Sequence, residues 1–332
     1  MSDGLSSNAI VFRQPGSLAV QTVNLTPATE DDLVIDVLSS GISTGTEKML
    51  WNGTMPAFPG LAYPLVPGYE AVGVIRRAGS NCSLNEGETV FVPGASCYQG
   101  DLRGLFGASA STLVVPESRV MPVGGLPNNQ ATLLALAATA MHILTYRVRQ
   151  LQPGENLHIS DIVSSVPQLI VGHGVLGRLL ARICVAAGAD APLVCELDAL
   201  RQQGAIGYDV VSPDAVALSQ LAHVVDVSGS CGDHFNRLIA KLGKGGRLTL
   251  GGFYSEPVTF DFAPAFMREA TIGIAAEWVP DDLSLVLALL QAGVLNFDGL
   301  VTHELPINKA QEAYSQAFDD PACLKMIINW SA

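Results

Sequence analysis

The hexapeptide GHGVLG, at residues 172–177, has the spacing G-x-G-x-x-G between an apolar run, 169–171, and a helical stretch, 178–182. In that pattern the first glycine makes a tight turn, the second lets the backbone approach a pyrophosphate, and the third lets helix and strand pack closely. The phosphates would lie on the amide groups of the helix N-terminus. The sequence therefore predicts a dinucleotide site, with a loop made by Gly172, His173, Gly174, Val175, Leu176 and Gly177.

A carboxylate, Glu196, lies at the position after the glycine loop where a dinucleotide site binds the ribose hydroxyls. Glu196 lies 24 residues after Gly172 and ends an apolar run. An acid at about this distance, roughly 20 residues on, binds the ribose hydroxyls, and its charge repels a 2′-phosphate. NAD is therefore favoured over NADP. In the alternative interpretation Glu196 is an ordinary surface acid and Asp198 takes this role. In the alternative interpretation of His173 the side chain only caps or hydrates the turn, and neither interpretation gives it a part in catalysis.

Two later segments, 226–229 and 250–254, lie where predicted strands end, and their turns suit the nicotinamide half of a dinucleotide. In open parallel sheets, ligands bind at the carboxyl ends of the strands. The residues assigned to the nicotinamide side are Ser228, Gly251, Gly252 and Phe253. In the alternative interpretation each of them belongs to an ordinary strand-end turn that binds no ligand.

The second part of the chain alternates short apolar segments with helical or turn segments. Six strands are predicted, at 169–171, 193–196, 208–211, 224–227, 247–250 and 271–275. Strands that alternate with helices form a doubly wound parallel sheet. The sequence thus predicts a Rossmann NAD-binding domain over 137–276, with a soft boundary within 130–165.

The first part of the chain is rich in β-forming segments separated by glycine and proline, and it predicts an all-β unit. Its clearest strands are at 19–23, 32–37, 71–75 and 88–92. After Glu277 the sequence returns to helices, 283–290 and 311–318, and to apolar segments, 301–305 and 324–328, which we expect to fold back onto this unit. We therefore predict an α/β protein with a β-rich catalytic domain over 1–136 and 277–332.

Composition limits the partners and the compartment. The net charge is −13 with only 18 Lys and Arg, which excludes the basic footprint of a nucleic-acid-binding protein. The six cysteines show no C-x-x-C spacing and the N-terminus lacks a secretory signal, so reduced thiols in the cytoplasm are expected. The apolar run 131–146 is shorter than the ~20 residues of a membrane span. It predicts a buried helix, which leaves only peripheral membrane contact open.

The chain resembles the medium-chain dehydrogenase/reductase superfamily over nearly its whole length. Residues 41–47, GISTGTE, look like the segment where zinc alcohol dehydrogenases place a cysteine ligand, and 67–70, PGYE, looks like their G-H-E segment. The resemblance implies a GroES-like fold for the β-rich catalytic domain. It also implies catalytic positions at Ser43 or Thr44, at Tyr69 and at Glu70.

The resemblance also shows where zinc chemistry is missing. The cysteine position holds Ser43 or Thr44, the histidine position holds Tyr69, and a normal zinc site wants thiolate, imidazole and carboxylate ligands. The region 90–115, where relatives carry a structural zinc, has only Cys97. We therefore predict no metal. A remote alternative is a rebuilt site from Glu47, Glu70 and His142.

Longer strings resemble one family within the superfamily, the bacteriochlorophyllide a dehydrogenases of bacteriochlorophyll biosynthesis. They include LIVGHGVLGRLLA, GGFYSEPVTFDFAPAFMREA and DPACLKM. The resemblance implies oxidation of the 3-(1-hydroxyethyl) side chain of a chlorophyllide or bacteriochlorophyllide to 3-acetyl, with NAD as the acceptor. Related folds commonly pair as homodimers through the edge of the nucleotide-domain sheet.

Without zinc, other groups must take the alcohol proton. Our hypothesis is a hydroxyl relay in which Thr46, Ser43 or Thr44 binds the substrate oxygen and Tyr69 or His142 passes the proton on. The alternatives are a packed aromatic for Tyr69, a core histidine for His142 and a structural role for Glu70. Glu47 and Lys48 are expected to pair on the surface.

Two other functions stay open. One is a zinc-free quinone or enone reductase that uses NADPH, against which Glu196 argues. The other is a non-catalytic nucleotide- or pigment-binding protein, which the missing zinc ligands keep open.

Overall fold

The computed structural model describes residues 4–57 and 59–331, which form two compact units. Unit 1 comprises the described residues of Met1–Ala135 and Leu300–Ala332, and unit 2 is Leu136–Gly299. The first boundary lies next to the predicted one, whereas residues 277–299 belong to unit 2 and not, as predicted, to the β-rich domain. One reason is a buried carboxylate, Asp282 of helix α8 (Pro280–Gln291), which bonds to His142 and Arg149 of helix α3 (Leu134–Leu151) in unit 2.

Unit 2 contains the predicted parallel sheet. Its strand order is β12-β11-β10-β13-β14-β15, and every neighbouring pair is parallel. From β10 the chain adds β11 and β12 on one side of the sheet and then β13, β14 and β15 on the other side. In open sheets, ligands bind where the direction of strand addition changes, which here is at β10. All six predicted strands are confirmed, as β10 (Leu169–Val171), β11 (Leu193–Cys195), β12 (Val210–Val211), β13 (Leu221–Asp226), β14 (Leu242–Leu250) and β15 (Thr271–Ile274).

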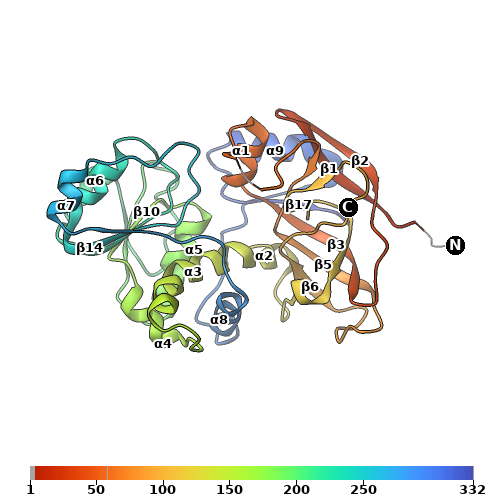
Figure 1. Ribbon diagram of the computed structural model, residues 1–332, viewed down its shortest axis with the longest axis horizontal. Helices are drawn as coiled ribbons and strands as arrows, with labels where there is room; N and C mark the ends of the chain where they lie inside the picture. The colour runs from red at the N-terminus through yellow and green to blue at the C-terminus, as the bar shows by residue number, and fades with distance from the viewer. Residues whose placement is uncertain (1–3, 58, 332) are drawn as a thin grey trace. The chain divides into compact units, whose positions relative to one another are not determined.

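Helices accompany these strands, and in Figure 1 α6 and α7 lie side by side in this unit. The amphipathic helix α5, which follows the glycine loop, buries most of its residues. Apolar side chains of β10, β13, β14 and α6 form a core that contains residues of unit 2 only. The helices are α3 (Leu134–Leu151), whose first two residues fall in unit 1, α4 (Ile159–Ile162), α5 (Val175–Ala186), α6 (His234–Lys241), α7 (Phe262–Met267) and α8 (Pro280–Gln291), with 3-10 turns at Val163–Ser165 and Pro213–Ala215.

Unit 1 is built on two sheets, as the β-rich sequence predicts. The smaller sheet has the order β2-β1-β4-β7, with β1 (Ser6–Gln14), β2 (Ser17–Asn24), β4 (Leu65–Val66) and β7 (Arg103–Gly104). The larger has the order β16-β17-β3-β5-β6-β9, and β8 also pairs with β3. Its strands are β3 (Asp32–Ile42), β5 (Ala71–Ala78), β6 (Thr89–Val92), β8 (Thr112–Pro116), β9 (Met121–Pro122), β16 (His303–Pro306) and β17 (Met326–Asn329).

Residues 300–331 belong to this unit and complete its larger sheet, which confirms the predicted return for 301–305, 311–318 and 324–328 but not for the helix at 283–290. Strand β17 pairs antiparallel with β3. Figure 1 shows helix α9 beside helix α1, where Trp51 and Phe318 bring their rings into contact. The helices are α1 (Thr46–Asn52), α2 (Asn128–Ala131) and α9 (Ala310–Asp319), with 3-10 turns at Glu117–Arg119 and Ile307–Lys309.

One stretch of the described chain, Asn128–Leu151, is long and apolar enough to cross a membrane by length and composition. Within the protein, 78% of the apolar 18-residue window in this stretch is buried. This agrees with the predicted buried helix, because core helices are apolar in the same way.

Candidate active site

The glycine loop joins β10 to α5 in the geometry that its spacing predicts. Gly172 has a φ of +104°, and a Cβ added there would lie 2.9 Å from the Cα of Ser228. A Cβ on Gly177 would lie 1.9 Å from the carbonyl oxygen of Gly172, so only glycine lets the helix start this close to the strand. A Cβ on Gly174 would meet no described atom within 4 Å. Gly172 and Gly177 thus serve the fold, and Gly174 leaves open space at the helix start.

That space suits an anion. Gly174 is the N-cap of α5 and provides no side-chain cap. The amide groups of the first helical turn, from Val175, Leu176 and Gly177, are therefore left for another acceptor, and the helix dipole favours negative charge there. The loop fits the pyrophosphate of a dinucleotide.

Glu196, directly after β11, places its carboxylate against this loop. It accepts hydrogen bonds from the backbone N–H of His173 at 2.8 Å and from that of Asp198 at 2.9 Å. A carboxylate has about four lone-pair sites, so it can still accept ribose hydroxyls. Asp198 instead accepts from the backbone N–H groups of Leu200 and Arg201, which stabilises its own turn. The geometry favours Glu196 over Asp198 as the ribose acid.

The imidazole of His173 points into the protein and does not cap or hydrate the turn. Its Nδ1 lies 2.5 Å from the carbonyl oxygen of Arg201, and its Nε2 lies 2.7 Å from the hydroxyl of Tyr208. The residue is fully buried. Burial, with the nearby Arg178 charge, lowers its pKa to about 4, so the ring is neutral at physiological pH.

The end of β13 meets the glycine loop, where a Cβ on Gly172 would lie 2.9 Å from the Cα of Ser228, and the end of β14 lies beside that of β13. Buried Asp226 accepts hydrogen bonds from the hydroxyl of Ser228 at 2.7 Å and from that of Tyr254 at 2.8 Å. A Cβ on Gly251 would lie 2.5 Å from Ile143 of α3, so this glycine serves helix packing.

Of the other two residues assigned to the nicotinamide side, one is close-packed and one is open. A Cβ on Gly252 would lie 3.4 Å from the Tyr254 hydroxyl. Phe253 is 44% exposed. Sequence reasoning assigned the segments 226–229 and 250–254 to this side but did not predict the bond of Tyr254 to Asp226, which fixes the turn that carries Ser228.

In unit 1, the hydroxyl groups of the hypothetical relay gather between the end of β3 and the start of α1. The Tyr69 hydroxyl donates to Ser43 Oγ at 2.7 Å and also bonds to the side chain of Thr46. Thr44, between them in sequence, is partly exposed. Burial, with the nearby Glu70 carboxylate, raises the pKa of Tyr69 well above its usual range. Tyr69 therefore keeps its proton at neutral pH and acts as a donor.

Glu47 lies inside this cluster, and the expected surface pair with Lys48 is wrong. Its carboxylate accepts from the backbone N–H of Ser43 at 3.1 Å and from the hydroxyl of Tyr314 at 2.8 Å. Glu47 faces the core together with Leu50 of the same helix, and burial raises its pKa to about 7. The ammonium of Lys48 instead donates to the carbonyl oxygen of Phe318.

Glu70 forms an ion pair with Lys325, and both side chains are buried. Lys325 also donates to the carbonyl oxygen of Ile42 at 3.2 Å. Desolvation raises the pKa of Glu70 more than the neighbouring ammonium lowers it. Sequence reasoning missed Lys325 and Tyr314. A lysine inside an apolar strand, LKMII at 324–328, is the signal that could have drawn attention to a buried charge.

His142 belongs to a different cluster, in unit 2. Its Nδ1 lies 2.8 Å from Asp282 Oδ2, and Asp282 Oδ1 accepts from Thr145 at 2.6 Å and from Arg149 at 2.9 Å. These bonds, with that from the backbone N–H of Val279, hold the pKa of Asp282 below its usual range despite burial. The cluster ties α8 to α3.

The groups where zinc-dependent relatives hold metal do not fit zinc. Ser43 and Tyr69 hydrogen-bond to each other, and the Glu70 carboxylate is neutralised by Lys325. Among residues 4–57 and 59–331, no three His, Cys, Asp or Glu side chains gather as a metal site, which includes the set Glu47, Glu70 and His142.

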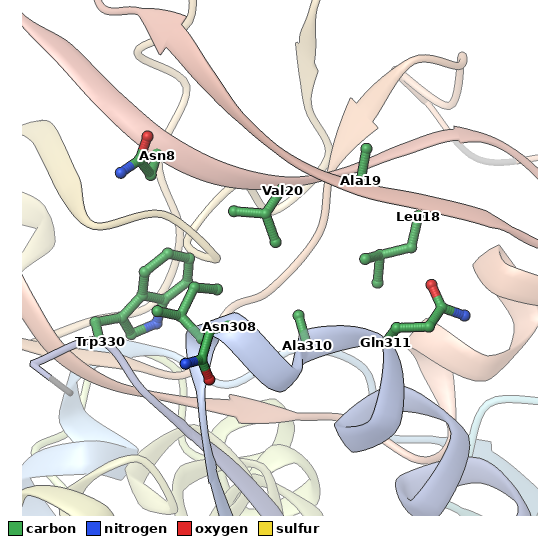
Figure 2. A pocket seen from close by; sticks show the side chains of 9 residues that line it. Asn8, Leu18, Ala19, Val20, Asn308, Ala310, Gln311 and Trp330 are labelled. Atoms are coloured by element: carbon green, nitrogen blue, oxygen red, sulfur yellow. The ribbon is translucent and has the colours of Figure 1, made fainter.

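Figure 2 shows a separate surface hollow of about 420 Å³ in unit 1. None of its lining residues is a predicted site residue. They are Asn8, Leu18, Ala19, Val20, Ile307, Asn308, Ala310, Gln311 and Trp330.

Comparison with known proteins places these two sites in a family context. Residues 29–125 match the family model of the alcohol dehydrogenase GroES-like domain. The chain is 45% identical to the 2-desacetyl-2-hydroxyethyl bacteriochlorophyllide A dehydrogenase of Rhodobacter capsulatus over 326 residues, 98% of this chain and 99% of the relative. Similarity at this level over whole chains shows common family membership.

Solved structures with lower identity show the fold. An alcohol dehydrogenase from Escherichia coli CFT073, in complex with NADH, has a TM-score of 0.78 at 18% identity, over 98% of this chain and 100% of that one. A dehydrogenase of Sinorhizobium meliloti classed as zinc-binding, bound to NADP, has a TM-score of 0.76 at 18% identity over the same shares. The two neighbours bind different nicotinamide cofactors.

Proposed function

The chain belongs to the family of 2-desacetyl-2-hydroxyethyl bacteriochlorophyllide a dehydrogenases, within the medium-chain dehydrogenase/reductase superfamily, and we propose that it oxidises the 3-(1-hydroxyethyl) group of a chlorophyllide or bacteriochlorophyllide to 3-acetyl, with NAD and without zinc. It is an alcohol dehydrogenase that uses a nicotinamide cofactor. The family relation carries the choice of substrate.

The contact of Glu196 with the glycine loop supports NAD. Its carboxylate is held at the backbone N–H of His173 by a 2.8 Å hydrogen bond, next to the open space over Gly174. An acid there accepts the ribose hydroxyls and repels a 2′-phosphate. The cofactor supplies the hydride acceptor. Ser228 and Phe253 follow the strands beside the loop, where we assign them to the nicotinamide side.

Oxidation of the alcohol also releases a proton, which unit 1 is suited to handle. We assign binding of the substrate oxygen to Thr46, Ser43 or Thr44. Tyr69, already bonded to Ser43, takes the alcohol proton through this hydroxyl and in the same step gives its own proton to solvent or to the cofactor ribose, because its raised pKa keeps it protonated. Glu70 and Lys325 hold a fixed charge pair beside these groups. His142 stays the alternative relay, although its Nδ1 is held by Asp282.

We expect the reaction to take place in the cytoplasm, because none of the six cysteines, all within the described residues, forms a disulfide. A homodimer through an edge of the nucleotide-domain sheet stays a prediction.

The test of the reaction is direct. The purified protein is incubated with NAD and the 3-hydroxyethyl pigment, and the absorption spectrum is followed. A red shift of the pigment, with one NADH formed per acetyl group, is expected, because the new carbonyl group conjugates with the macrocycle. Pigment binding without a shift would favour a carrier, and hydride transfer from NADPH to a quinone or enone alone would favour the reductase.

Zinc and cofactor choice have separate tests. Stoichiometric zinc in active protein, by elemental analysis, would contradict the zinc-free mechanism. Glu196→Gln should lower the preference for NAD over NADP by about tenfold, the size of one lost charge-assisted contact. Asp198→Asn, in the same turn, should leave that preference unchanged.

A further inference from the structure

One side chain, that of His173, joins the two segments to which the proposed function assigns the ADP part of the cofactor. His173 itself belongs to the glycine loop, and its backbone N–H donates to the Glu196 carboxylate. Its imidazole bonds to Arg201 and Tyr208, in the segment 196–208 that follows β11. No other residue of the glycine loop has a recorded side-chain hydrogen bond to that segment within the described chain.

The hydrogen-bond partners fix the ring in one state. The carbonyl oxygen of Arg201 can only accept, so Nδ1 carries the hydrogen. The oxygen of Tyr208 accepts from Arg182, and its hydroxyl donates to Nε2 of His173. Arg182, Tyr208, His173 and Arg201 thus form one directed chain, in which a neutral imidazole has both nitrogens satisfied.

The first half of the segment forms its own turn, in which Asp198 accepts from Leu200 and Arg201 and the Gln202 side chain donates to the carbonyl oxygen of Glu196. The second half has little support of its own. Residues 203–207 are exposed, and Gly204 and Gly207 have positive φ. Buried Arg178 donates to the carbonyl oxygens of His173, Arg201, Gln203 and Gly204. Arg178 and His173 therefore hold backbone carbonyls of the segment from inside the protein, and they fix its path directly after Glu196.

We propose that His173 is a positioning residue for cofactor choice: by bonding Arg201 and Tyr208 it holds the segment 196–208 so that the Glu196 carboxylate stays at the glycine loop and selects an unphosphorylated adenosine ribose. The imidazole is directed to Arg201 and Tyr208, and we assign it no part in hydride or proton transfer. The assignment rests on the proposed function, because it presupposes that this site takes a nicotinamide dinucleotide.

The test measures binding without pigment. NADH and NADPH are titrated into the full chain by their fluorescence, for wild type, His173→Ala and Tyr208→Phe. His173→Ala should weaken NADH binding about tenfold while NADPH binding changes little, so the preference falls by the same factor. Tyr208→Phe keeps the ring that packs edge-on against His173 and loses only the hydroxyl, and it should lower the preference about threefold.

His223→Ala is the matched control. His223 is also a buried, neutral histidine of unit 2, bonded to Thr249 and Arg247 toward the amino end of β13, and it makes no recorded bond to the segment 196–208. This variant should lose thermal stability as His173→Ala does and keep the wild-type preference. The preference, and not the stability, separates a positioning role from a merely structural one.

Each outcome decides the question. If wild type binds neither dinucleotide, the proposed function fails and this assignment with it. If wild type prefers NADH and both His173→Ala and Tyr208→Phe retain that preference, the assignment alone fails. If His173→Ala does not fold, Tyr208→Phe carries the test, and an unchanged preference in that variant overturns the assignment.

Discussion

The glycine loop of unit 2 and the hydroxyl cluster of unit 1 are built in opposite ways. The loop is made by backbone groups of neighbouring residues, and its glycines are required by close approaches such as that of Gly177 to the oxygen of Gly172. The cluster is made by side chains from distant segments, as in the bond between Glu47 and Tyr314. A backbone site depends on the absence of Cβ atoms, whereas a side-chain site depends on every partner being present.

The two regions also treat negative charge differently. Glu196 lies partly exposed and is held by two backbone N–H groups. Glu47 and Glu70 are fully buried, one bonded to a tyrosine and the other paired with Lys325. Buried carboxylates without such partners would cost several kcal/mol. The cluster should therefore be the more fragile of the two regions toward single substitutions.

Lys325→Met should produce the largest effect, because it leaves the Glu70 carboxylate buried without its counter-charge. The expected loss is about 3–5 kcal/mol of unfolding free energy. Urea denaturation followed by tryptophan fluorescence measures it, since Trp51 and Trp330 lie in the same unit.

The matched variant is Glu70→Gln combined with Lys325→Met, which removes both charges. It should recover most of the lost stability, because the penalty comes from the unpaired charge. A single Lys325→Met variant as stable as wild type would show that this pair does not hold the cluster together.

Tyr69→Phe should have the next largest effect, on turnover. The variant loses the hydroxyl that donates to Ser43 Oγ, and kcat for the hydroxyethyl pigment should fall about 100-fold, within the range of a lost acid–base group. The dissociation constant for NADH should not change, because the loop in unit 2 is intact. NADH formation and NADH titration give the two readings.

Tyr63→Phe is its control. Tyr63 is another tyrosine of unit 1, and its hydroxyl donates to a backbone oxygen, that of Leu50. This variant should retain turnover. Full activity of Tyr69→Phe at every pH would exclude Tyr69 as an acid or base and leave the relay to the threonines and His142.

Glu47→Gln should change how stability depends on pH. The pKa of Glu47 is raised from 4.5 to about 7, so between these values the folded state binds more protons than the unfolded state. Wild-type stability therefore falls as pH rises through this window. The variant does not titrate and should gain on the order of 2 kcal/mol over wild type between pH 5 and pH 8.

Melting temperatures across that range measure the gain, and Lys48→Gln serves as the neighbouring control. Lys48 is partly exposed and should give a difference that does not depend on pH. A Glu47→Gln curve parallel to that of wild type would mean that Glu47 titrates in the folded protein as it does in the unfolded one, which would contradict the raised pKa.

These two regions also differ in how far the sequence could predict them. The six strands and the glycine loop follow from local apolar runs and glycine spacing, and all six strands were found. The burial of Glu47 depends on Tyr314, 267 residues away, and the Lys325 contact with Ile42 spans 283 residues. No local pattern could pair residues so far apart.

The same limit explains the domain boundary after Glu277. Helix α8 has an ordinary amphipathic pattern, which fits packing on either unit. Its position is decided by Asp282, which bonds to His142 and Arg149 of α3. The pattern predicted a helix correctly, and only the partner of one buried carboxylate determined the unit to which it belongs.

Gly174→Ala should have the smallest effect and tests the backbone site most directly. The added methyl group meets no described atom within 4 Å and the φ of Gly174 is −71°, so the fold and its melting temperature should stay at wild-type values. The methyl group would occupy the space over the first turn of α5 that we assign to the pyrophosphate, so NADH should bind about tenfold more weakly. Gly177→Ala should do the reverse, because its Cβ lies 1.9 Å from a backbone oxygen, and lose about 1–3 kcal/mol of stability. If Gly174→Ala bound NADH as wild type does, the open space would not be the phosphate site, and the loop would differ from the hydroxyl cluster in construction but not in the function that we assign to it.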